Sequence, residues 1–554
     1  MKKKKKSSCS CIPQQDVCND SLLNTCKPNN TCKPVNSCKK SVKKYIEPIC
    51  NDCEVKFVDT CADLASKAEE LFEKALEHQC IAEETLEQAK ECEESAKVLA
   101  TYGIKSYIFE SLRPTPELSF AVRYLKCAGG IMITASHNPK EHNGYKVYDD
   151  TGCQLLPEAA DQVVQYVNEV DDELNIKVFS DEEAYPYMTW IGEEVDEAYY
   201  KEVMAIEVNP GMDKSDFKIV FSPQHGTSNI AVRTCLTRLG YDLVPVLAQC
   251  APDPDFSNTK SPNPEVPASY ELAIKKAKEV DADVVVITDP DGDRLGVVAK
   301  HNGEYVLMSG NQSAAVYLEY ILSQMKEKGT LPDNAVMYNT IVTSDLGELV
   351  ARSYGVDVEK TLTGFKFIGD KIRKYEQTHE KTFVFGYEES YGCVIKDFVR
   401  DKDAVQAVLT AAEAGNFYKK QGKDLVDVLN ELYAKHGTFK ETQIALSKAG
   451  AAGAARIKEI MDNLRKDAPQ EIGGVKVVKV EDYGNSTCSD GTTIQLPKSN
   501  VLKYYLEDGS WIAARPSGTE PKCKFYFSIK GSDADDAASK TEVFHKAMME
   551  IIGE

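Results

Sequence analysis

Short apolar runs alternate with amphipathic stretches from about residue 94 to the end of the chain. Four of these runs have the length and composition of buried strands: Ile131-Met-Ile-Thr134, Lys218-Ile-Val-Phe221, Val284-Val-Val-Ile287 and Phe383-Val-Phe385. A polar loop containing Gly or Pro follows each run directly. The alternation predicts α/β domains, in which functional groups gather beyond the carboxyl ends of the strands.

The first hundred residues have a different character, because eleven of the 18 cysteines lie there. Residues 1–50 also hold eleven lysines against three acidic residues, a net charge of +8. This composition predicts a flexible Cys/Lys-rich tail over residues 1–60, for which a zinc site, oxidised cysteines and reduced thiols all remain open. From Cys61 to Val98 the spacing of Leu and Ala predicts a long acidic helix.

Size and charge narrow the possible functions. A chain of 554 residues is too long for one hydrophobic core, so we expect three to five domains. The net charge of -21 argues against a general attraction to nucleic acid or to anionic membranes. No apolar run reaches 18 residues, and the lysines near the start are not followed by an apolar segment, so we expect a soluble cytoplasmic protein.

The serine loop, residues 134–139, places Ser136 beside His137 after a predicted strand. A strand-ending serine is more often a turn or helix-capping residue than a nucleophile. Here His137, Lys140 and Lys146 could supply the base and the positive surroundings that a serine nucleophile needs. Both interpretations remain open for this loop alone.

The aspartate loop, residues 288–294, presents Asp289, Asp291 and Asp293 at alternate positions after a strand. Three carboxylates are hard oxygen donors suited to Mg²⁺, and so close together they repel one another unless a cation lies among them. A calcium EF-hand is excluded, because its twelfth position would be Lys300 and Arg294 would replace its turn glycine. A solvated acidic turn is the remaining alternative.

Two further loops carry polar groups after predicted strands. The glutamate loop, residues 386–392, offers acceptors for sugar hydroxyls between two glycines. The arginine loop, residues 515–522, combines a guanidinium, two hydroxyls, a glycine and backbone N–H groups, which are the donors that a phosphate needs. Each is, by itself, also consistent with a surface turn.

Together the four loops resemble, in their order and amino-acid sequence, those of the α-D-phosphohexomutase superfamily. The resemblance is to phosphoglucomutases and phosphomannomutases, in particular the branch that includes phosphopentomutases, and runs from about Glu94 to the C-terminus. Besides the loops, the matching segments are Phe109-Glu-Ser-Leu-Arg113-Pro-Thr-Pro, Asn143-Gly-Tyr-Lys146, Ser222-Pro-Gln-His225-Gly226-Thr, Thr363-Gly-Phe-Lys366-Phe-Ile-Gly369 and Arg400-Asp-Lys-Asp403.

The resemblance implies three α/β domains with mixed sheets and a C-terminal α+β domain around a central cleft, preceded by the tail and the long helix. The expected boundaries are residues 61–205 for the long helix with a truncated phosphoserine domain, 206–312 for the metal-binding domain, 313–435 for the sugar-binding domain and 436–554 for the phosphate-binding domain. A monomer or weak dimer is expected, with a phosphorylated monosaccharide as partner.

The resemblance also implies a phosphoglucomutase-type isomerase of glucose metabolism. It would interconvert glucose 1-phosphate and glucose 6-phosphate through a phosphoserine and a bisphosphorylated sugar, with glucose 1,6-bisphosphate as activator and intermediate. Mannose or pentose phosphates remain alternative substrates. The implied roles are catalysis by Ser136, His137, Lys146 and Arg294, Mg²⁺ binding by Ser136, Asp289, Asp291 and Asp293, and substrate binding by Glu388, Ser390, Arg515, Ser517, Gly518 and Thr519.

One departure concerns the start of the chain. Members of this family open with a Gly-rich segment whose Arg-Gly pair reaches the active site, but the first arginine of this chain is Arg113. The first domain is therefore expected to lack outer strands and to expose a sheet edge. A catalytically impaired, phosphosugar-binding relative with a structural Cys-rich head is the second functional hypothesis.

Overall fold

The computed structural model describes residues 90–172, 175–517 and 521–554. The predicted tail and most of the predicted acidic helix lie outside these ranges, but residues 90–101 are helical. Among the described residues, none of the helices combines the length and apolar character of a bilayer-spanning segment.

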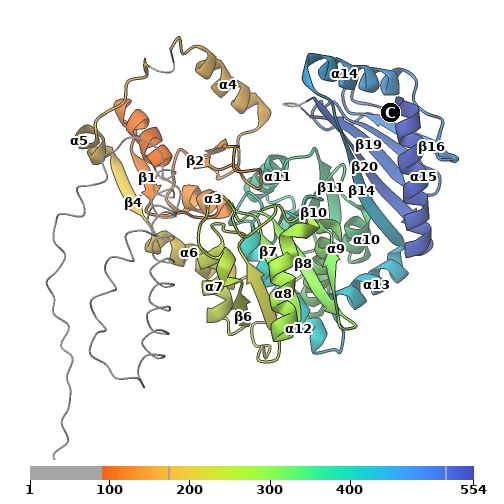
Figure 1. The fold of residues 1–554 in the computed structure, drawn as a ribbon, viewed down its shortest axis with the longest axis horizontal. Helices are drawn as coiled ribbons and strands as arrows, with labels where there is room; N and C mark the ends of the chain where they lie inside the picture. Colours follow the sequence, from red (N-terminus) through yellow and green to blue (C-terminus); the bar gives the residue numbers. More distant parts are fainter. Residues whose placement is uncertain (1–89, 173–174, 518–520) are drawn as a thin grey trace, which may run out of the picture. The chain divides into compact units, whose positions relative to one another are not determined.

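The first domain contains two small sheets that share no strand in the described part of the chain (Figure 1). One is a parallel pair and the other an antiparallel pair. Ala96 and Ala100 of the 90–101 helix pack with Ile108 and Met188 of the parallel pair. Its elements are β1 (Ser106–Phe109), α3 (Thr115–Tyr124), β2 (Gly129–Ile133), β3 (Tyr145–Asp149), α4 (Pro157–Asn168), α5 (Asp181–Ala184), β4 (Met188–Ile191) and α6 (Glu193–Met204).

The second domain is built on a five-stranded mixed sheet with the order β6-β5-β7-β8-β9. Its elements are β5 (Lys218–Ser222), α7 (Asn229–Arg238), β6 (Asp242–Pro245), α8 (Glu271–Val280), β7 (Val284–Thr288), β8 (Leu295–His301) and β9 (Glu304–Met308). Both faces of β7 are covered, because Val284 and Val286 belong to one apolar cluster while Val285 and Ile287 belong to another. This explains why its sequence is continuously apolar instead of alternating.

The third domain has the four-stranded mixed sheet β11-β10-β12-β13. Its elements are α9 (Gly310–Glu327), β10 (Ala335–Thr340), α10 (Asp345–Ser353), β11 (Asp357–Thr361), α11 (Phe365–Thr378), β12 (Thr382–Tyr387), β13 (Cys393–Val394), α12 (Ala404–Lys419) and α13 (Leu425–His436). The Asp403 carboxylate caps α12 by accepting the N–H groups of Val405 and Gln406 at 2.9 and 3.1 Å. The N-terminus of this buried helix is thereby fixed.

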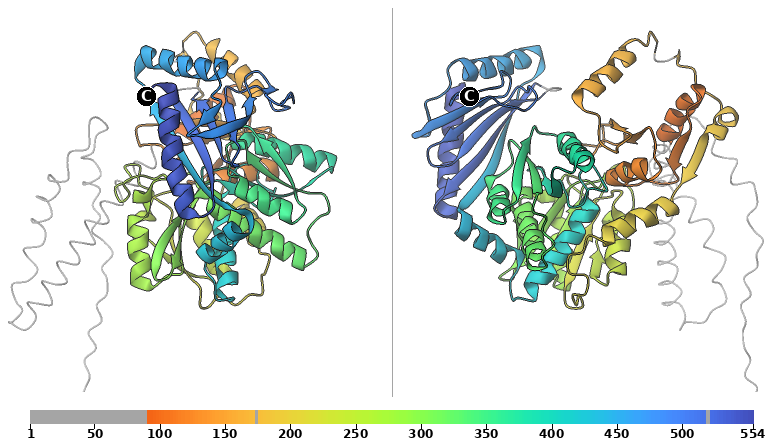
Figure 2. Two further views of the ribbon diagram at one scale, coloured as in Figure 1. Left: turned by 90° about the vertical axis from the view of Figure 1, so that its right-hand side faces the viewer. Right: turned by 180° about the vertical axis from the view of Figure 1, so that it is seen from behind.

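The C-terminal domain is an antiparallel sheet with the order β14-β20-β19-β18-β16-β15, and β17 pairs with β16. Its elements are β14 (Thr438–Ser447), α14 (Gly450–Lys466), β15 (Glu471–Ile472), β16 (Val475–Asp482), β17 (Thr487–Cys488), β18 (Leu502–Leu506), β19 (Trp511–Pro516), β20 (Lys522–Gly531) and α15 (Ala534–Ile552). Helices α14 and α15 pack on one face of this sheet, as both views of Figure 2 show for α15. These two helices cover this face, and the opposite face contributes to a separate apolar cluster.

Candidate active site

The serine loop follows β2 and holds Ser136 in an unusual backbone conformation. Its φ is +57°, in the left-handed region that a non-glycine residue seldom adopts. The Ser136 N–H donates to Oγ of Thr134 at 2.8 Å, which ties the turn together. The Ser136 hydroxyl lies 3.0 Å from Nδ1 of His137, so the two predicted catalytic groups are within hydrogen-bond distance.

The aspartate loop follows β7 and buries all three of its carboxylates. Oδ1 of Asp289 accepts the backbone N–H groups of Asp293 and Arg294 at 3.0 and 2.9 Å. Gly292 has a φ of +69°, and a Cβ at this position would lie 2.8 Å from Cβ of Pro114. The tight turn that gathers the carboxylates thus requires glycine.

The structure brings the serine and aspartate loops together. Oγ of Ser136 lies 3.3 Å from Oδ1 of Asp291, although 155 positions separate the two residues. Two helix starts support the aspartate loop from other domains: the N–H of Thr115 donates to the Asp291 carbonyl at 2.8 Å, and the N–H of Ala404 donates to the Gly292 carbonyl at 3.1 Å. Segments of the first, second and third domains therefore meet here.

Three cationic side chains surround the three carboxylates. Nζ of Lys146 lies 2.8 Å from Asp291, Nζ of Lys402 lies 2.9 Å from Asp293, and Nε of Arg294 lies 3.9 Å from both Asp289 and Asp293. The argument that such carboxylates repel unless a metal separates them is therefore incomplete, because protein cations also offset the repulsion. Burial opposes protonation of Lys146, but the neighbouring Asp291 and Asp293 keep its pKa above the ordinary value.

Lys402 is a site residue that the sequence prediction did not include. It lies in the segment Arg400-Asp-Lys-Asp403, directly before the cap of α12, and its position depends on that capped helix start. No local pattern marks it as a partner of Asp293, which lies 109 positions earlier. Only the packing of the third domain against the second reveals the contact.

The aspartate cluster has the donors that a hard divalent cation requires. One oxygen from each of the three side chains lies within 4.8 Å of the others. Oδ2 of Asp289 and Oδ1 of Asp293 are buried and accept no hydrogen bond. Burial, together with the charges of Asp291 and Asp293, raises the pKa of Asp289 well above its ordinary value. These residues fit Mg²⁺.

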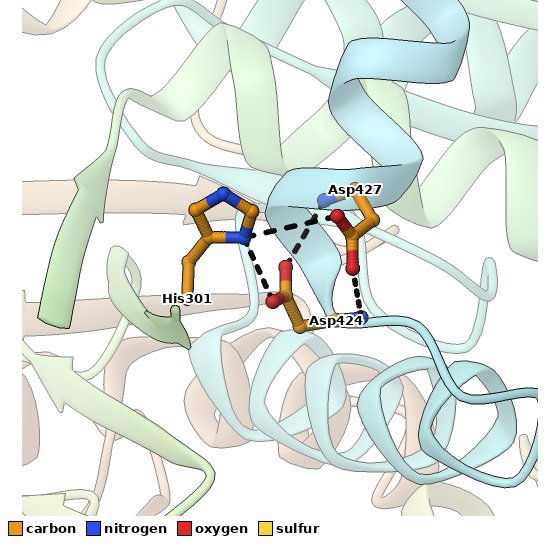
Figure 3. A group of neighbouring side chains, drawn as sticks. All are labelled: His301, Asp424 and Asp427. Atoms are coloured by element: carbon orange, nitrogen blue, oxygen red, sulfur yellow. Dashed lines mark hydrogen bonds and ion pairs between the residues drawn. The ribbon is translucent and has the colours of Figure 1, made fainter. Parts of the chain in front are cut away.

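A second group, of one His and two Asp side chains, is shown in Figure 3 and differs from the aspartate cluster in its hydrogen bonds. Nδ1 of His301 lies 2.8 Å from Oδ2 of Asp424 and 3.8 Å from Oδ1 of Asp427. The other oxygens of the two aspartates cap α13, and Asn302 donates to Nε2 of His301 at 2.9 Å. Nδ1 of His301 is thus a donor to Asp424, and the group is a set of hydrogen bonds that links β8 to α13. The positive N-terminus of α13 further disfavours a cation there.

The glutamate loop follows β12 and places Glu388 in a buried position. Oε1 of Glu388 accepts the N–H of Gly364 at 2.8 Å. Burial raises the pKa of Glu388 to about 7, against the opposing charge of Lys402. Ser390 is half-buried in the same loop, and Glu389 accepts hydrogen bonds from Thr340 and Thr343 at 3.1 and 3.3 Å.

The arginine loop is only partly described, since Gly518 and Thr519 lie outside the described residues. Arg515 is at the end of β19, and the N–H of Ser517 donates to the carbonyl of Lys522 at 2.7 Å. Among the described residues, no hydrogen bond or ion pair joins Arg515 to Ser136 or to the aspartates. The described residues thus bring Ser136 and Asp291 into contact, whereas Arg515 has no such bond to either loop.

Comparison with known proteins gives matches along most of the chain. The matching family models are phosphoglucomutase/phosphomannomutase α/β/α domain I over residues 88–174, domain II over 197–303, domain III over 309–436 and the C-terminal domain over 455–546. The phosphoglucomutases of Staphylococcus epidermidis (strain RP62A) and Staphylococcus aureus (strain MRSA252) are each 39% identical to this chain. These alignments cover 80% of this chain and 81% and 80% of those proteins.

Solved structures share the fold at lower identity. The Paramecium pp63/parafusin phosphoglucomutase, in its open form, aligns with a TM-score of 0.58 and 20% identity over 81% of this chain and 84% of that one. A phosphoglucomutase/phosphomannomutase family protein of Burkholderia thailandensis gives a TM-score of 0.56 and 19% identity, with coverages of 80% and 82%.

Three α/β domains followed by a C-terminal domain of this type define an α-D-phosphohexomutase. The chain belongs to the phosphoglucomutase/phosphomannomutase family and is an isomerase of that family. The two staphylococcal relatives are named phosphoglucomutases, so they do not support the phosphopentomutase-like branch included in the sequence prediction.

Proposed function

We propose that the protein interconverts glucose 1-phosphate and glucose 6-phosphate, with a phosphoserine at Ser136 and glucose 1,6-bisphosphate as intermediate. The main support is the 3.3 Å approach of the Ser136 hydroxyl to Asp291 within the buried aspartate cluster. The names of the 39% identical relatives support glucose as the sugar. Mg²⁺ is the proposed metal, held by Asp289, Asp291, Asp293 and the phosphorylated Ser136.

In the forward direction the bond between phosphorus and Oγ of Ser136 breaks, a bond from phosphorus to the sugar 6-oxygen forms, and the 6-hydroxyl proton is transferred to Oγ of Ser136. The bisphosphate then turns over, its 1-phosphate returns to Ser136, and the serine proton is transferred to the sugar 1-oxygen. Mg²⁺ held by the three aspartates would supply positive charge to the transferring phosphoryl group. Lys146 and Arg294 add positive charge beside the same carboxylates.

His137 is the proposed acceptor of the Ser136 proton when the phosphoryl group returns. Its Nδ1 lies 3.0 Å from the serine hydroxyl. Burial, followed by the positive charge of Arg294, lowers the pKa of His137 to about 3, so its imidazole is neutral at pH 7. A neutral ring has a free acceptor nitrogen, although a pKa this low makes it a weak base until the negative charge of a phosphoryl group approaching Ser136 raises that pKa. Lys146, whose pKa is raised, stays protonated and serves as the cationic partner.

The proposed substrate contacts come from the other two loops. Arg515, Ser517, Gly518 and Thr519 bind the phosphate that does not react, and Glu388 and Ser390 bind the sugar hydroxyls. The same phosphate pocket must accept either end of the sugar, because the bisphosphate binds in two orientations. The same proposal includes a cytoplasmic location and a monomeric or weakly dimeric state. It also includes domain boundaries at 205/206, 312/313 and 435/436.

A coupled assay of glucose 1-phosphate turnover tests the proposal, with mannose 1-phosphate and ribose 1-phosphate assayed in parallel. Glucose 1-phosphate should give the highest kcat/KM, and activity should require Mg²⁺. Phosphopeptide analysis after incubation with glucose 1,6-bisphosphate should find phosphate on Ser136. Turnover with no phosphate on Ser136 would refute the phosphoserine. A preference for another sugar would refute glucose as the substrate. Absence of both turnover and phosphoserine would favour the impaired, phosphosugar-binding relative.

A further inference from the structure

The second face of the C-terminal sheet packs against the third domain. Helices α14 and α15 cover one face, while residues of the opposite face form a separate apolar cluster with the third domain. That cluster consists of Ile341, Val342, Leu362, Tyr483, Val501, Trp511, Ala513 and Tyr526. The contact joins the domain that carries the glutamate loop to the domain that carries the arginine loop.

A lysine lies in this apolar interface. Lys503 of β18 is 0% exposed, and its Nζ donates to the carbonyl of Ile341 at 2.8 Å. The same Nζ lies 3.8 Å from the ring centroid of Trp511 and 4.8 Å from that of Tyr505. Burying an ammonium group is costly, and one carbonyl with two aromatic faces offsets only part of that cost. An apolar side chain would pack here without the penalty, so stability alone does not explain the lysine.

Trp511 makes a second polar contact across the same interface. Its Nε1–H donates to Oδ2 of Asp345 at 3.0 Å, and Oδ1 of Asp345 pairs with Lys360 at 3.1 Å. Asp345 is the first residue of α10. Lys503 and Trp511 therefore hold the two ends of one short segment of the third domain, residues 341–345.

This segment connects to both substrate-binding loops. Thr343 of this segment and Thr340 directly before it donate to Glu389, the neighbour of Glu388 in the glutamate loop, so that loop is fixed from one side. On the other side, Trp511 begins β19, the strand that ends with Arg515 and Pro516 at the arginine loop. Trp511 and Arg515 lie four positions apart on a strand, so their side chains are on the same face of the sheet.

We propose that Lys503 and Trp511 form an interdomain clamp that sets the spacing between the glutamate loop and the arginine loop. Lys503 is thus a positioning residue for the sugar phosphate. This inference rests on the proposed function, in which one loop binds the sugar hydroxyls and the other binds the phosphate. Because one substrate must reach both loops, a change in their spacing weakens binding more than it slows phosphoryl transfer at Ser136.

The test is steady-state kinetics of Lys503→Met with glucose 1-phosphate. Methionine keeps an apolar stem that reaches Cε but removes the nitrogen that donates to the Ile341 carbonyl. The KM should rise at least about tenfold, while kcat changes less than about threefold. The matched control is Lys479→Met, in β16 of the same sheet. Nζ of Lys479 lies 5.4 Å from Tyr505, but its ion pairs are with Glu481 and Asp490 of its own domain.

Trp511→Phe provides a second variant should Lys503→Met fail to fold, because it keeps an aromatic face under Lys503 but removes the N–H donated to Asp345 and part of the ring volume. It should also raise KM, and the double variant should show less than additive effects if both residues belong to one clamp. An unchanged KM in either folded variant would overturn the clamp. So would an equal rise in the Lys479→Met control.

Hydrogen–deuterium exchange separates the failure of the clamp from the failure of the proposed function. In Lys503→Met, exchange should accelerate at residues 341–345 and 511–516, with no change in the control variant. Faster exchange in this variant with no turnover by the wild-type protein would support the clamp and refute the mutase. Normal wild-type turnover with unchanged exchange and KM in Lys503→Met would refute the clamp and leave the mutase standing.

Discussion

Replacing Asp289 by asparagine should stabilise the metal-free protein and abolish its stabilisation by metal. Asp289 is fully buried, its Oδ1 accepts two backbone N–H groups, and its Oδ2 accepts no hydrogen bond. The amide keeps an acceptor for both N–H groups and removes the charge beside Asp291 and Asp293. Neutralising the acceptor costs about 1 kcal/mol per hydrogen bond. Where Asp289 is ionised, the cation paired with it is Arg294 at 3.9 Å, and removing this weakly paired buried charge stabilises the protein by about 3–5 kcal/mol, a net gain of about 1–3 kcal/mol.

Thermal unfolding in EDTA and in MgCl₂ or MnCl₂ measures both effects. Since 1 kcal/mol corresponds to about 2–4 °C in Tm for a cooperative unit of about 150–250 residues or more, and the first three domains share one apolar cluster, Asp289→Asn should melt about 2–12 °C above the wild type in EDTA. The metal salts should raise the Tm of the wild type only. Asp281→Asn, at an exposed aspartate paired with Lys300, is the control and should shift Tm by less than about 2 °C. A lower Tm of Asp289→Asn in EDTA, or an undiminished response to metal, would refute the reasoning.

Three further predictions concern single residues. Ser136→Ala should lower kcat by about 10³-fold or more while binding of glucose 6-phosphate, measured by calorimetry, stays within about threefold; retained turnover would exclude the serine. Lys402→Met removes the cation 2.9 Å from Asp293 and should lower kcat/KM by about 10–100-fold; unchanged kinetics would contradict its role. Burial, with repulsion from Lys360, lowers the pKa of Lys503 from 10.5 to about 7, so the unfolded chain binds more protons between those pH values. The free energy of unfolding of the wild type relative to Lys503→Met should therefore rise from pH 7 to 9, by at most about 1.4 kcal/mol per pH unit, and a difference that stays constant with pH would refute this.

The strands were predictable where burial on both faces leaves a continuous apolar run. The run Val284–Ile287 becomes β7, and Lys218–Phe221 becomes β5, each with one more residue at its carboxyl end. The run Ile131–Thr134 is also predicted to be a buried strand, but β2 spans Gly129–Ile133 and is only half-buried, and Thr134 directly after it accepts the N–H of Ser136. The approach of Ser136 to Asp291 follows from the expectation that both loops lie at carboxyl ends of strands and from the family resemblance.

The electrostatics of the site could not be predicted in the same way. Sequence shows the repulsion among Asp289, Asp291 and Asp293 and places Arg294 directly after them, but Lys146 is expected there only from the family resemblance and Lys402 is not expected. Lys146 lies more than a hundred positions before them and Lys402 more than a hundred after. Each reaches the carboxylates only because separate domains pack together. The buried lysine of the clamp escapes prediction for the same reason, since nothing near Lys503 in the chain distinguishes it from a surface residue of a strand.

The left-handed conformation of Ser136 decides how experiments on this residue should be designed. Alanine has the same steric cost as serine at a φ of +57°, so Ser136→Ala compares two proteins with equal local strain. Glycine would remove the steric cost and increase the conformational freedom of the loop, whereas the β-branch of threonine would disfavour the left-handed conformation. A failed Ser136→Thr rescue would consequently reflect distorted geometry, and alanine is the replacement whose inactivity reports the missing hydroxyl alone.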